Sequence, residues 1–218
     1  MRKLTVSRAP ATPEGSPGHW REGAITERRP LGYLVALRAV IRCAANTARL
    51  LREHRIRLPA GQVGKRLHFA DGTTARVYRE TVIDRCATAD PCVLGVTFRL
   101  RAVRGWGHAV FRAESLLNTP LFAGFPGLVS KLWLAADERD RYRGLYEWDG
   151  PRRAEAYARA LWRVLALVSV PGSIHYIVLP GLRRDEVLAR PQVLAGLAPA
   201  AAGTAAWWRL ADVTRAEG

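Results

Sequence analysis

The order of predicted elements between residues 93 and 180 restricts the fold more than any other feature of the chain. Apolar periodicity and turn residues divide this stretch into four strands and two helices. In chain order these are a strand over 93–103, a helix over 107–118, strands over 128–136 and 142–148, a helix from Pro151 to Pro171, and a strand over 174–179. Apolar and polar residues alternate in the first strand, so one of its faces is expected to meet solvent or a polar cavity.

The order strand, helix, strand, strand, helix, strand is that of the ferredoxin-like βαββαβ fold. We therefore expect an α+β domain over residues 93–182, with one antiparallel sheet that carries both helices on one face. The other face of such a sheet would expose apolar side chains, so it needs a partner. That partner could be the N-terminal part of the chain or a second copy of the chain.

The remaining residues are expected to form an extension and two tails. Residues 1–29 are rich in Arg, Pro, Gly and Glu without apolar periodicity, which predicts a mobile tail. Residues 183–218 are expected to form a second tail with one short helical stretch. Residues 30–92 predict a helix over 31–54 and a β-hairpin around Asp71-Gly72. The helix is amphipathic, with Leu34, Leu37, Ile41, Ala44, Ala48 and Leu51 on an apolar side and Arg38, Arg42, Arg49 and Arg52 on the opposite side.

The chain is strongly basic, with 34 Lys and Arg against 19 Asp and Glu and a net charge of +15. Such an excess suggests a polyanionic partner, either nucleic acid or an acidic membrane surface. Nucleic acid is disfavoured because one helix alone precedes the hairpin, whereas a helix-turn-helix domain needs a supporting helix pair. An acidic-lipid contact through the arginine side of the helix stays open.

The N-terminal residues favour a cytoplasmic protein. Residues 1–30 contain many charges and prolines and lack the apolar region of a secretory signal. Residues 31–51 are apolar enough to raise the question of a transmembrane segment, but Arg38, Arg42 and Arg49 interrupt them. We therefore expect no transmembrane segment.

Residues 93–120 and 125–181 carry a resemblance to a known superfamily. The matching pieces are Phe125-Pro126-Gly127 before a strand, Lys131-Leu132-Trp133 within that strand, the strand from Tyr142 to Trp148, and the helix after it. These pieces resemble the dimeric α+β barrel superfamily, in the branch of bacterial monooxygenase-like proteins akin to the antibiotic-biosynthesis monooxygenases. The N-terminal extension departs from the short family pattern.

This resemblance implies a homodimer in which two four-stranded sheets pack into a barrel, with an apolar pocket in each subunit. The superfamily includes cofactor-free oxygenases, haem-degrading enzymes, small-ring cyclases and members without known activity. It has no shared catalytic motif, so no catalytic residue is carried over to this chain.

Aromatic residues and one lysine are the candidates for a substrate-binding site. Strand alternation places Lys131 with Trp133 on one face, and Tyr146 with Trp148 on one face. The predicted binding residues are Trp106, Lys131, Trp133, Tyr146, Trp148 and Trp162. Indole rings suit a flat, aromatic or polyketide-like ligand, while ordinary packing of the core or of a dimer interface is the simpler alternative.

Three residues are candidates for proton transfer or for holding an anion: His108, Arg112 and His175. His108 lies at the start of a predicted helix and His175 on the last predicted strand, so both could face one cavity. Lys131 or Arg112 could hold a substrate enolate or carboxylate. A cross-strand ion pair between Lys131 and Glu147 is the simpler interpretation of Lys131.

No cofactor is expected. The five histidines form neither an HxxxH nor an HxH pair, and the chain contains no glycine-rich phosphate loop. The sequence therefore predicts a small-molecule enzyme, either a cofactor-independent oxygenase or a cyclase, that acts on an apolar aromatic substrate. A non-catalytic ligand-binding dimer is the first alternative, and a nucleic-acid-binding protein that uses the arginine-rich N-terminal half is the second.

Overall fold

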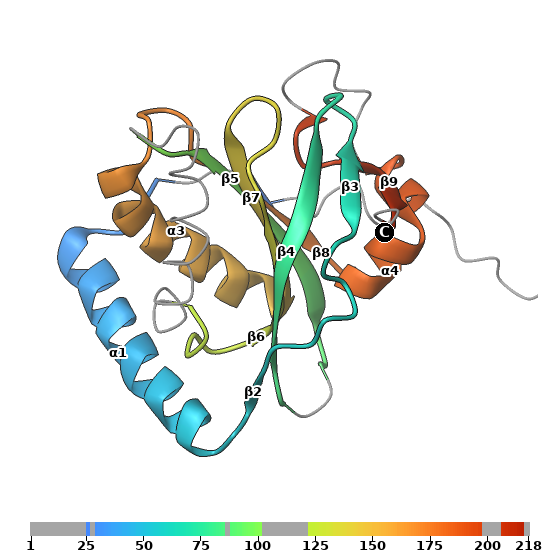
Figure 1. The fold of residues 1–218 in the computed structure, drawn as a ribbon. Helices are drawn as coiled ribbons and strands as arrows, with labels where there is room; N and C mark the ends of the chain where they lie inside the picture. The colour runs from blue at the N-terminus through green and yellow to red at the C-terminus, as the bar shows by residue number, and fades with distance from the viewer. Residues whose placement is uncertain (1–24, 27–28, 86–87, 102–121, 198–205, 216–218) are drawn as a thin grey trace, which may run out of the picture.

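The computed structural model describes residues 25–26, 29–85, 88–101, 122–197 and 206–215. These residues form an α+β fold around a curled antiparallel sheet (Figure 1). The elements are β1 (Ile25–Thr26), α1 (Tyr33–Arg52), β2 (Ile56–Arg57), β3 (Arg66–Phe69), β4 (Thr74–Ile83), β5 (Pro91–Arg99), β6 (Leu128–Leu134), β7 (Arg141–Asp149), α3 (Pro151–Val168), β8 (His175–Pro180), α4 (Arg184–Ala189), the 3-10 helix η3 (Pro191–Leu194) and β9 (Leu210–Thr214).

The strands lie in the order β1-β8-β5-β7-β6-β4-β3-β9, and β2 pairs with β4. The four strands predicted between residues 93 and 180 are therefore neighbours, in the order β8-β5-β7-β6. The hairpin predicted at Asp71-Gly72 is also present, since β3 pairs antiparallel with β4. Because β4 also pairs antiparallel with β6, this hairpin belongs to the same sheet. The predicted helix over 107–118 lies outside the described residues.

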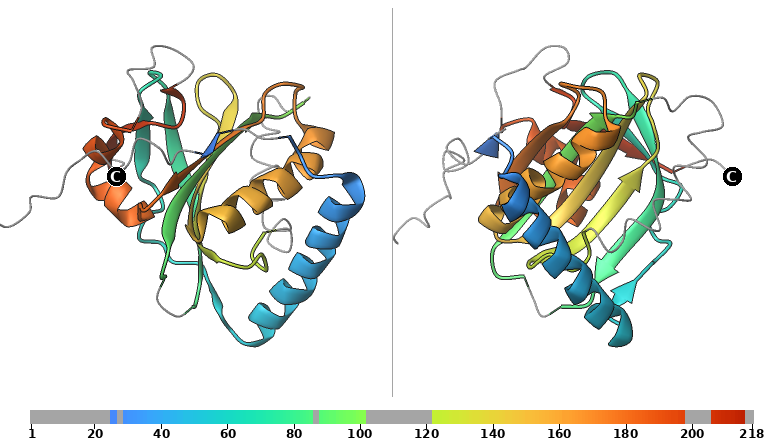
Figure 2. Two further views of the ribbon diagram at one scale, coloured as in Figure 1. Left: turned by 180° about the vertical axis from the view of Figure 1, so that it is seen from behind. Right: turned by 90° about the vertical axis from the view of Figure 1, so that its left-hand side faces the viewer.

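Both faces of the sheet are covered. Figure 2 shows α1, α3, the sheet and α4 as successive layers of the molecule. From Cys92 to Thr97, β5 is buried at every residue, so the expected solvent-facing side of this strand is wrong. The polar Thr97 is accommodated because its hydroxyl donates to the backbone oxygen of Tyr142 at 3.1 Å.

The C-terminal segment covers the face of the sheet opposite α3. Residues 183–218, expected as a tail, contain α4, η3 and β9, and β9 pairs with β3. The buried side chains that this segment contributes are Val187, Leu188, Leu194 and Leu210. They pack with Leu132 and Leu134 of β6 and Ile177 and Leu179 of β8. The apolar face that needed a partner is therefore covered by the chain itself.

A buried ion network ties the hairpin to the start of β7. Arg143 donates to Asp137 at 2.6 Å, to Asp71 at 3.1 Å and to the hydroxyl of Thr73 at 2.8 Å. Burial raises the pKa of Asp71, but the hydrogen bonds from Thr73 and the charges of Arg143 and Arg141 outweigh burial and leave that pKa below its ordinary value. The network therefore fixes the turn against the sheet.

Helix α1 forms where it was predicted, but the predicted apolar side does not face the protein. Its buried residues are Ala36, Cys43, Thr47 and Leu50. Leu34, Leu37, Ile41 and Leu51 of the predicted apolar side are 72%, 56%, 60% and 52% exposed. Cys43 and Thr47 face the protein instead, because their small side chains let α1 lie directly against the backbone of Gly124.

Gly124 is the point of closest approach to α1. A Cβ at this residue would collide with the backbone oxygen of Cys43 and lie 2.6 Å from the backbone nitrogen of Thr47. The amide of Asn46 also donates to the backbone oxygen of Gly124 at 3.2 Å. This part of the chain therefore requires glycine.

Substituting alanine for Gly124 is expected to lower the free energy of unfolding by about 1–3 kcal/mol, since α1 must move away from the loop. Urea denaturation of the purified variant measures the change. Gly61→Ala is the matched control, because a Cβ there meets nothing within 4 Å. Equal stability of the two variants would contradict the close packing of α1 on residue 124.

Across the described part of the chain, the helices are all too short or too polar to span a bilayer.

Candidate functional site

Lys131 projects from β6 toward the face of the sheet that carries α3. Its side chain is buried, and its Nζ lies over the rings of Trp133, Phe122 and Tyr146, at 3.1, 4.3 and 4.8 Å from the ring centroids. We call these three rings the Lys131 cage. Strand pairing explains the arrangement, because Lys131 and Trp133 share a face of β6 and Tyr146 lies directly opposite Lys131 on β7.

The charge around Lys131 is positive. Arg79 of β4 is also buried, and its guanidinium carbon lies 4.0 Å from the centroid of the Trp133 ring. Within the described ranges, no carboxylate lies within ion-pair distance of the Lys131 amine. Burial, with a smaller contribution from Arg79, holds the pKa of Lys131 well below its ordinary value. The lowered pKa increases the share of the unprotonated amine near neutral pH over that of an ordinary lysine.

Hydrogen bonds and a close backbone approach hold the rings of the cage. The indole nitrogen of Trp133 donates to the hydroxyl of Thr81 at 3.2 Å. The ring of Tyr146 lies back along its own strand, so a Cβ at Gly144 would stand 2.6 Å from its Cε2. The hydroxyl of Tyr157 donates to that of Tyr146 at 3.3 Å. Burial raises the pKa of both phenols, so both stay protonated at neutral pH.

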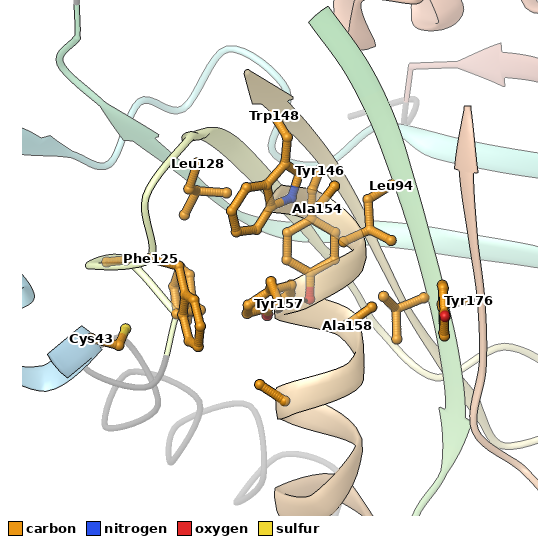
Figure 3. Packing of buried hydrophobic residues seen from close by; sticks show 14 of the residues in the cluster. Cys43, Leu94, Phe125, Leu128, Tyr146, Trp148, Ala154, Tyr157, Ala158 and Tyr176 are labelled. Carbon is orange, nitrogen blue, oxygen red and sulfur yellow. Dashed lines mark hydrogen bonds between the residues drawn. The ribbon is translucent and has the colours of Figure 1, made fainter. Parts of the chain in front are cut away.

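The aromatic surface continues from the cage along α3. The ring of Tyr157 lies 5.5 Å from that of Tyr146, 4.9 Å from that of Trp148 and 5.0 Å from that of Phe125, measured between centroids (Figure 3). Trp148 is fully buried in this cluster. These ring contacts are tilted or edge-on, and aromatic rings in such geometries also bind flat aromatic ligands.

The predicted binding residues divide into three groups. Lys131, Trp133 and Tyr146 are in direct contact, and Trp148 joins them through Tyr157. Trp162 lies farther along α3, with its ring 6.0 Å from that of Tyr176. Trp106 lies outside the described residues.

The predicted proton-transfer residues are not brought to the cage. His108 and Arg112 lie outside the described residues. His175 is on β8 with its ring 6.4 Å from that of Trp207, whereas the next residue, Tyr176, packs in the cluster on the α3 side. Because neighbouring strand residues point to opposite faces, His175 lies on the face away from Lys131.

The expected ion pair between Lys131 and Glu147 is wrong. Glu147 is opposite Ser130 in the register, and it accepts a hydrogen bond from the backbone nitrogen of Arg184 at 3.1 Å. It also lies 3.5 Å from the guanidinium of Arg183. Glu147 therefore faces the C-terminal segment, on the side of the sheet opposite Lys131.

Sequence reasoning missed four residues of the candidate site: Arg79, Phe122, Gly144 and Tyr157. A glycine between bulky residues in a strand signals close packing, so Gly144 carried a usable signal. Arg79 reaches the cage through the pairing of β4 with β6, and no local pattern fixes that register. Phe122 follows no periodic pattern.

The described residues were also compared with the requirements of a metal site. Among the residues that the structure describes, no three His, Cys, Asp or Glu side chains gather into a group that could hold a metal ion.

Comparison with known proteins finds only distant similarities. No protein-family profile and no curated protein matches the chain. A monooxygenase-like protein from Listeria innocua is 17% identical, over 53% of this chain and 69% of that one, with a TM-score of 0.35. A ferredoxin-fold protein related to antibiotic biosynthesis monooxygenases, from Listeria monocytogenes, is 16% identical over 60% of this chain and 85% of that one, also with a TM-score of 0.35.

A third solved structure, described as a major regulator of staphylococcal pathogenesis, is 12% identical over 71% of this chain and 96% of that one, with a TM-score of 0.32. At these values the similarities do not assign the chain to a family. Its function has to be argued from its own side chains.

Proposed function

We propose that this protein binds an apolar aromatic small molecule at the Lys131 cage and that the Lys131 amine takes an acidic proton from it. The observation that carries the proposal is a buried amine among three aromatic rings, with a guanidinium rather than a carboxylate nearby. Burying such an amine costs free energy, and costly buried groups are concentrated at functional sites.

The chemistry of the cage suits a substrate that becomes an anion. A phenol, or a C–H group next to a carbonyl, would transfer its proton to the free amine of Lys131 and leave a phenolate or enolate. The resulting ammonium group and the guanidinium of Arg79 would both stabilise that anion in a site of low dielectric constant. An ordinary lysine in water could not take the proton as well, because it is already protonated, and its charge would stabilise the anion less, because water screens the interaction.

An enolate formed in this way can react with molecular oxygen without a cofactor. In the oxygenase form of the proposal, a CH2 group next to a carbonyl and one O2 give a new C=O group and one H2O. The carbon is oxidised by four electrons and O2 supplies one oxygen atom to each product. In the cyclase form, the same enolate attacks a carbonyl carbon within the substrate, and the alkoxide that results takes the proton back from the ammonium group of Lys131.

We also propose that residues 93–182 form a ferredoxin-like core. The order β8-β5-β7-β6, with α3 connecting β7 to β8, is the arrangement expected for that core. In a dimeric barrel the second sheet would pack on the face that α4 and β9 cover here. The Lys131 cage lies on the other face, so its chemistry does not require a second copy of the chain.

Binding and oxidation of 1,8-dihydroxyanthrone, a flat ketone with an acidic CH2 group, test this function. We expect saturable quenching of tryptophan fluorescence, because Trp133 borders the amine, and oxygen uptake that falls by at least about a hundredfold in Lys131→Met. Lys65→Met is the matched control, since Lys65 lies in the turn before β3.

The fluorescence and oxygen-uptake results together decide whether the cage binds a ligand and whether it oxidises that ligand. Quenching without oxygen uptake in the wild-type protein would exclude the oxygenase form and leave the cyclase form or the non-catalytic binder. Equal activity of Lys131→Met and the wild-type protein, or no saturable quenching, would contradict a function for the cage.

A further inference from the structure

The outer face of α1 carries an apolar stripe with a row of arginines next to it, rather than on the opposite side of the helix as predicted. Leu34, Leu37 and Ile41 are spaced by three and four residues, so they lie along one side of the helix, and each is more than half exposed. The exposed arginines are Arg38, Arg42, Arg49 and Arg52. We call these seven residues the α1 outer face.

The charge of this face is uniform. Residues 33–52 contain four arginines and no Asp or Glu. The nearest acidic residue in sequence is Glu53, which lies 3.7 Å from Arg49 just after the helix. A helix with exposed leucines on one side and arginines beside them has the composition of helices that lie in the interface of a membrane.

The apolar surface extends past the helix onto the end of α3. The guanidinium carbon of Arg163 lies 4.3 Å from the centroid of the Tyr33 ring, which joins the first turn of α1 to α3. Leu167 is one helical turn beyond Arg163 and is 74% exposed. Figures 1 and 2 show α1 as the outermost layer, on the side of the molecule away from α4. The face is therefore accessible to a large flat partner.

We propose that the α1 outer face binds the surface of a membrane that contains anionic lipids. Leu34, Leu37 and Ile41 enter the boundary between headgroups and acyl chains, and the arginines contact the anionic headgroups. The protein lies on the bilayer, and α1 does not cross it. This inference is independent of the Lys131 cage, which lies between the sheet and α3.

Charge and polarity favour a lipid surface over the other partners. Two copies of the chain that met through this face would bring four arginines of each helix together with no acidic residue on either helix to pair with them. A nucleic acid would pair with the arginines but would leave the exposed leucines in water. An anionic bilayer accommodates both kinds of side chain.

Vesicle flotation of the full chain tests the proposal. The vesicles are phosphatidylcholine alone, or phosphatidylcholine with about a third phosphatidylserine, at low and high salt. We expect the protein to float with the anionic vesicles at low salt, to stay behind with the neutral ones, and to lose much of its binding at high salt. Absence of flotation with anionic vesicles, or equal flotation with both kinds, would overturn the proposal.

Two variants separate the apolar from the electrostatic part of the binding. The first is Leu34→Gln with Leu37→Gln and Ile41→Gln, and the second is Arg38→Gln with Arg42→Gln. Each should bind anionic vesicles at least about tenfold more weakly than the wild-type protein. All five side chains are exposed, so both variants should keep the wild-type circular dichroism spectrum.

The matched control is Arg76→Gln with Arg190→Gln, because both residues are exposed and lie on β4 and after α4 rather than on α1. It should bind nearly as well as the wild-type protein. An equal loss in the control would overturn the proposal, since binding would then follow net charge alone. Binding of duplex DNA that survives the leucine changes, without vesicle binding, would favour a nucleic acid. A dimer that only the leucine changes dissociate, without vesicle binding, would favour a second copy.

Discussion

Lys131→Met is expected to raise the free energy of unfolding by about 1–3 kcal/mol near pH 7, because it replaces a buried amine by an apolar side chain of similar length. The amine has ring contacts but, in the part of the chain described by the structure, no carboxylate to offset its burial. The same substitution should remove the proton transfer proposed for the site. A gain in stability together with a loss of activity is the signature of a residue kept for function.

The stability of the wild-type protein should also rise with pH relative to that of Lys131→Met. The pKa of Lys131 is lowered by folding, so between its folded-state pKa and the ordinary value of about 10.4 the unfolded chain binds more protons than the folded one. The contribution of Lys131 to the free energy of unfolding therefore increases with pH across this interval, and the advantage of Lys131→Met shrinks. Urea denaturation of both proteins from pH 6 to pH 10 measures the effect.

Lys65→Met serves as the control and should change the free energy of unfolding by no more than about 0.5 kcal/mol at any pH. If Lys131→Met were less stable than the wild-type protein, or if its advantage were the same at every pH, then the amine would not be a buried base.

Arg143→Met is expected to lower the free energy of unfolding by about 3–5 kcal/mol. The guanidinium binds Asp71 and Asp137, whose side chains are fully buried, and its removal would leave two carboxylates in the interior without their main partner. It also donates to the backbone oxygen of Trp207 at 3.2 Å, so the C-terminal segment would lose a contact. Denaturation with guanidinium chloride measures this decrease in the free energy of unfolding.

Arg190→Met is the matched surface control. Its guanidinium pairs with Glu186 at 2.9 Å, but the Arg190 side chain is 69% exposed. Exposed pairs contribute about 0–1 kcal/mol, so the two variants should differ clearly. Similar small losses for Arg143→Met and Arg190→Met would show that the network does not hold the hairpin to the sheet.

The strands could be predicted from the sequence because their signals are local. Alternation and turn residues placed β6, β7 and β8 within a few residues of their ends, and Asp71-Gly72 identified the hairpin. One short helical stretch was predicted from Arg183 onward, where α4 lies, but η3 and β9 escaped prediction because they have four and five residues. Elements of that length show too little periodicity to predict, and tertiary contacts decide their structure.

The buried face of α1 could not be predicted from hydrophobicity. The pattern of apolar residues predicted that the side of α1 with Leu34 and Ile41 is buried. The structure buries the side with Ala36 and Thr47 instead, because α1 packs closely on Gly124. Part of the site could be predicted from a local pattern, since strand alternation places Lys131 and Trp133 on one face of β6. Arg79 and Tyr157 come from distant segments, and their places depend on strand pairing and helix packing that no short pattern specifies.

The titration of the Lys131 amine tests the central claim most directly. The chain contains three lysines, Lys3, Lys65 and Lys131, so lysine labelled with 13C and 15N gives three side-chain resonances. The resonance that disappears in Lys131→Met should titrate well below the ordinary value of about 10.4 and move upward when an acidic aromatic ligand binds. Titration of all three amines near 10.4 would contradict a buried base in the Lys131 cage.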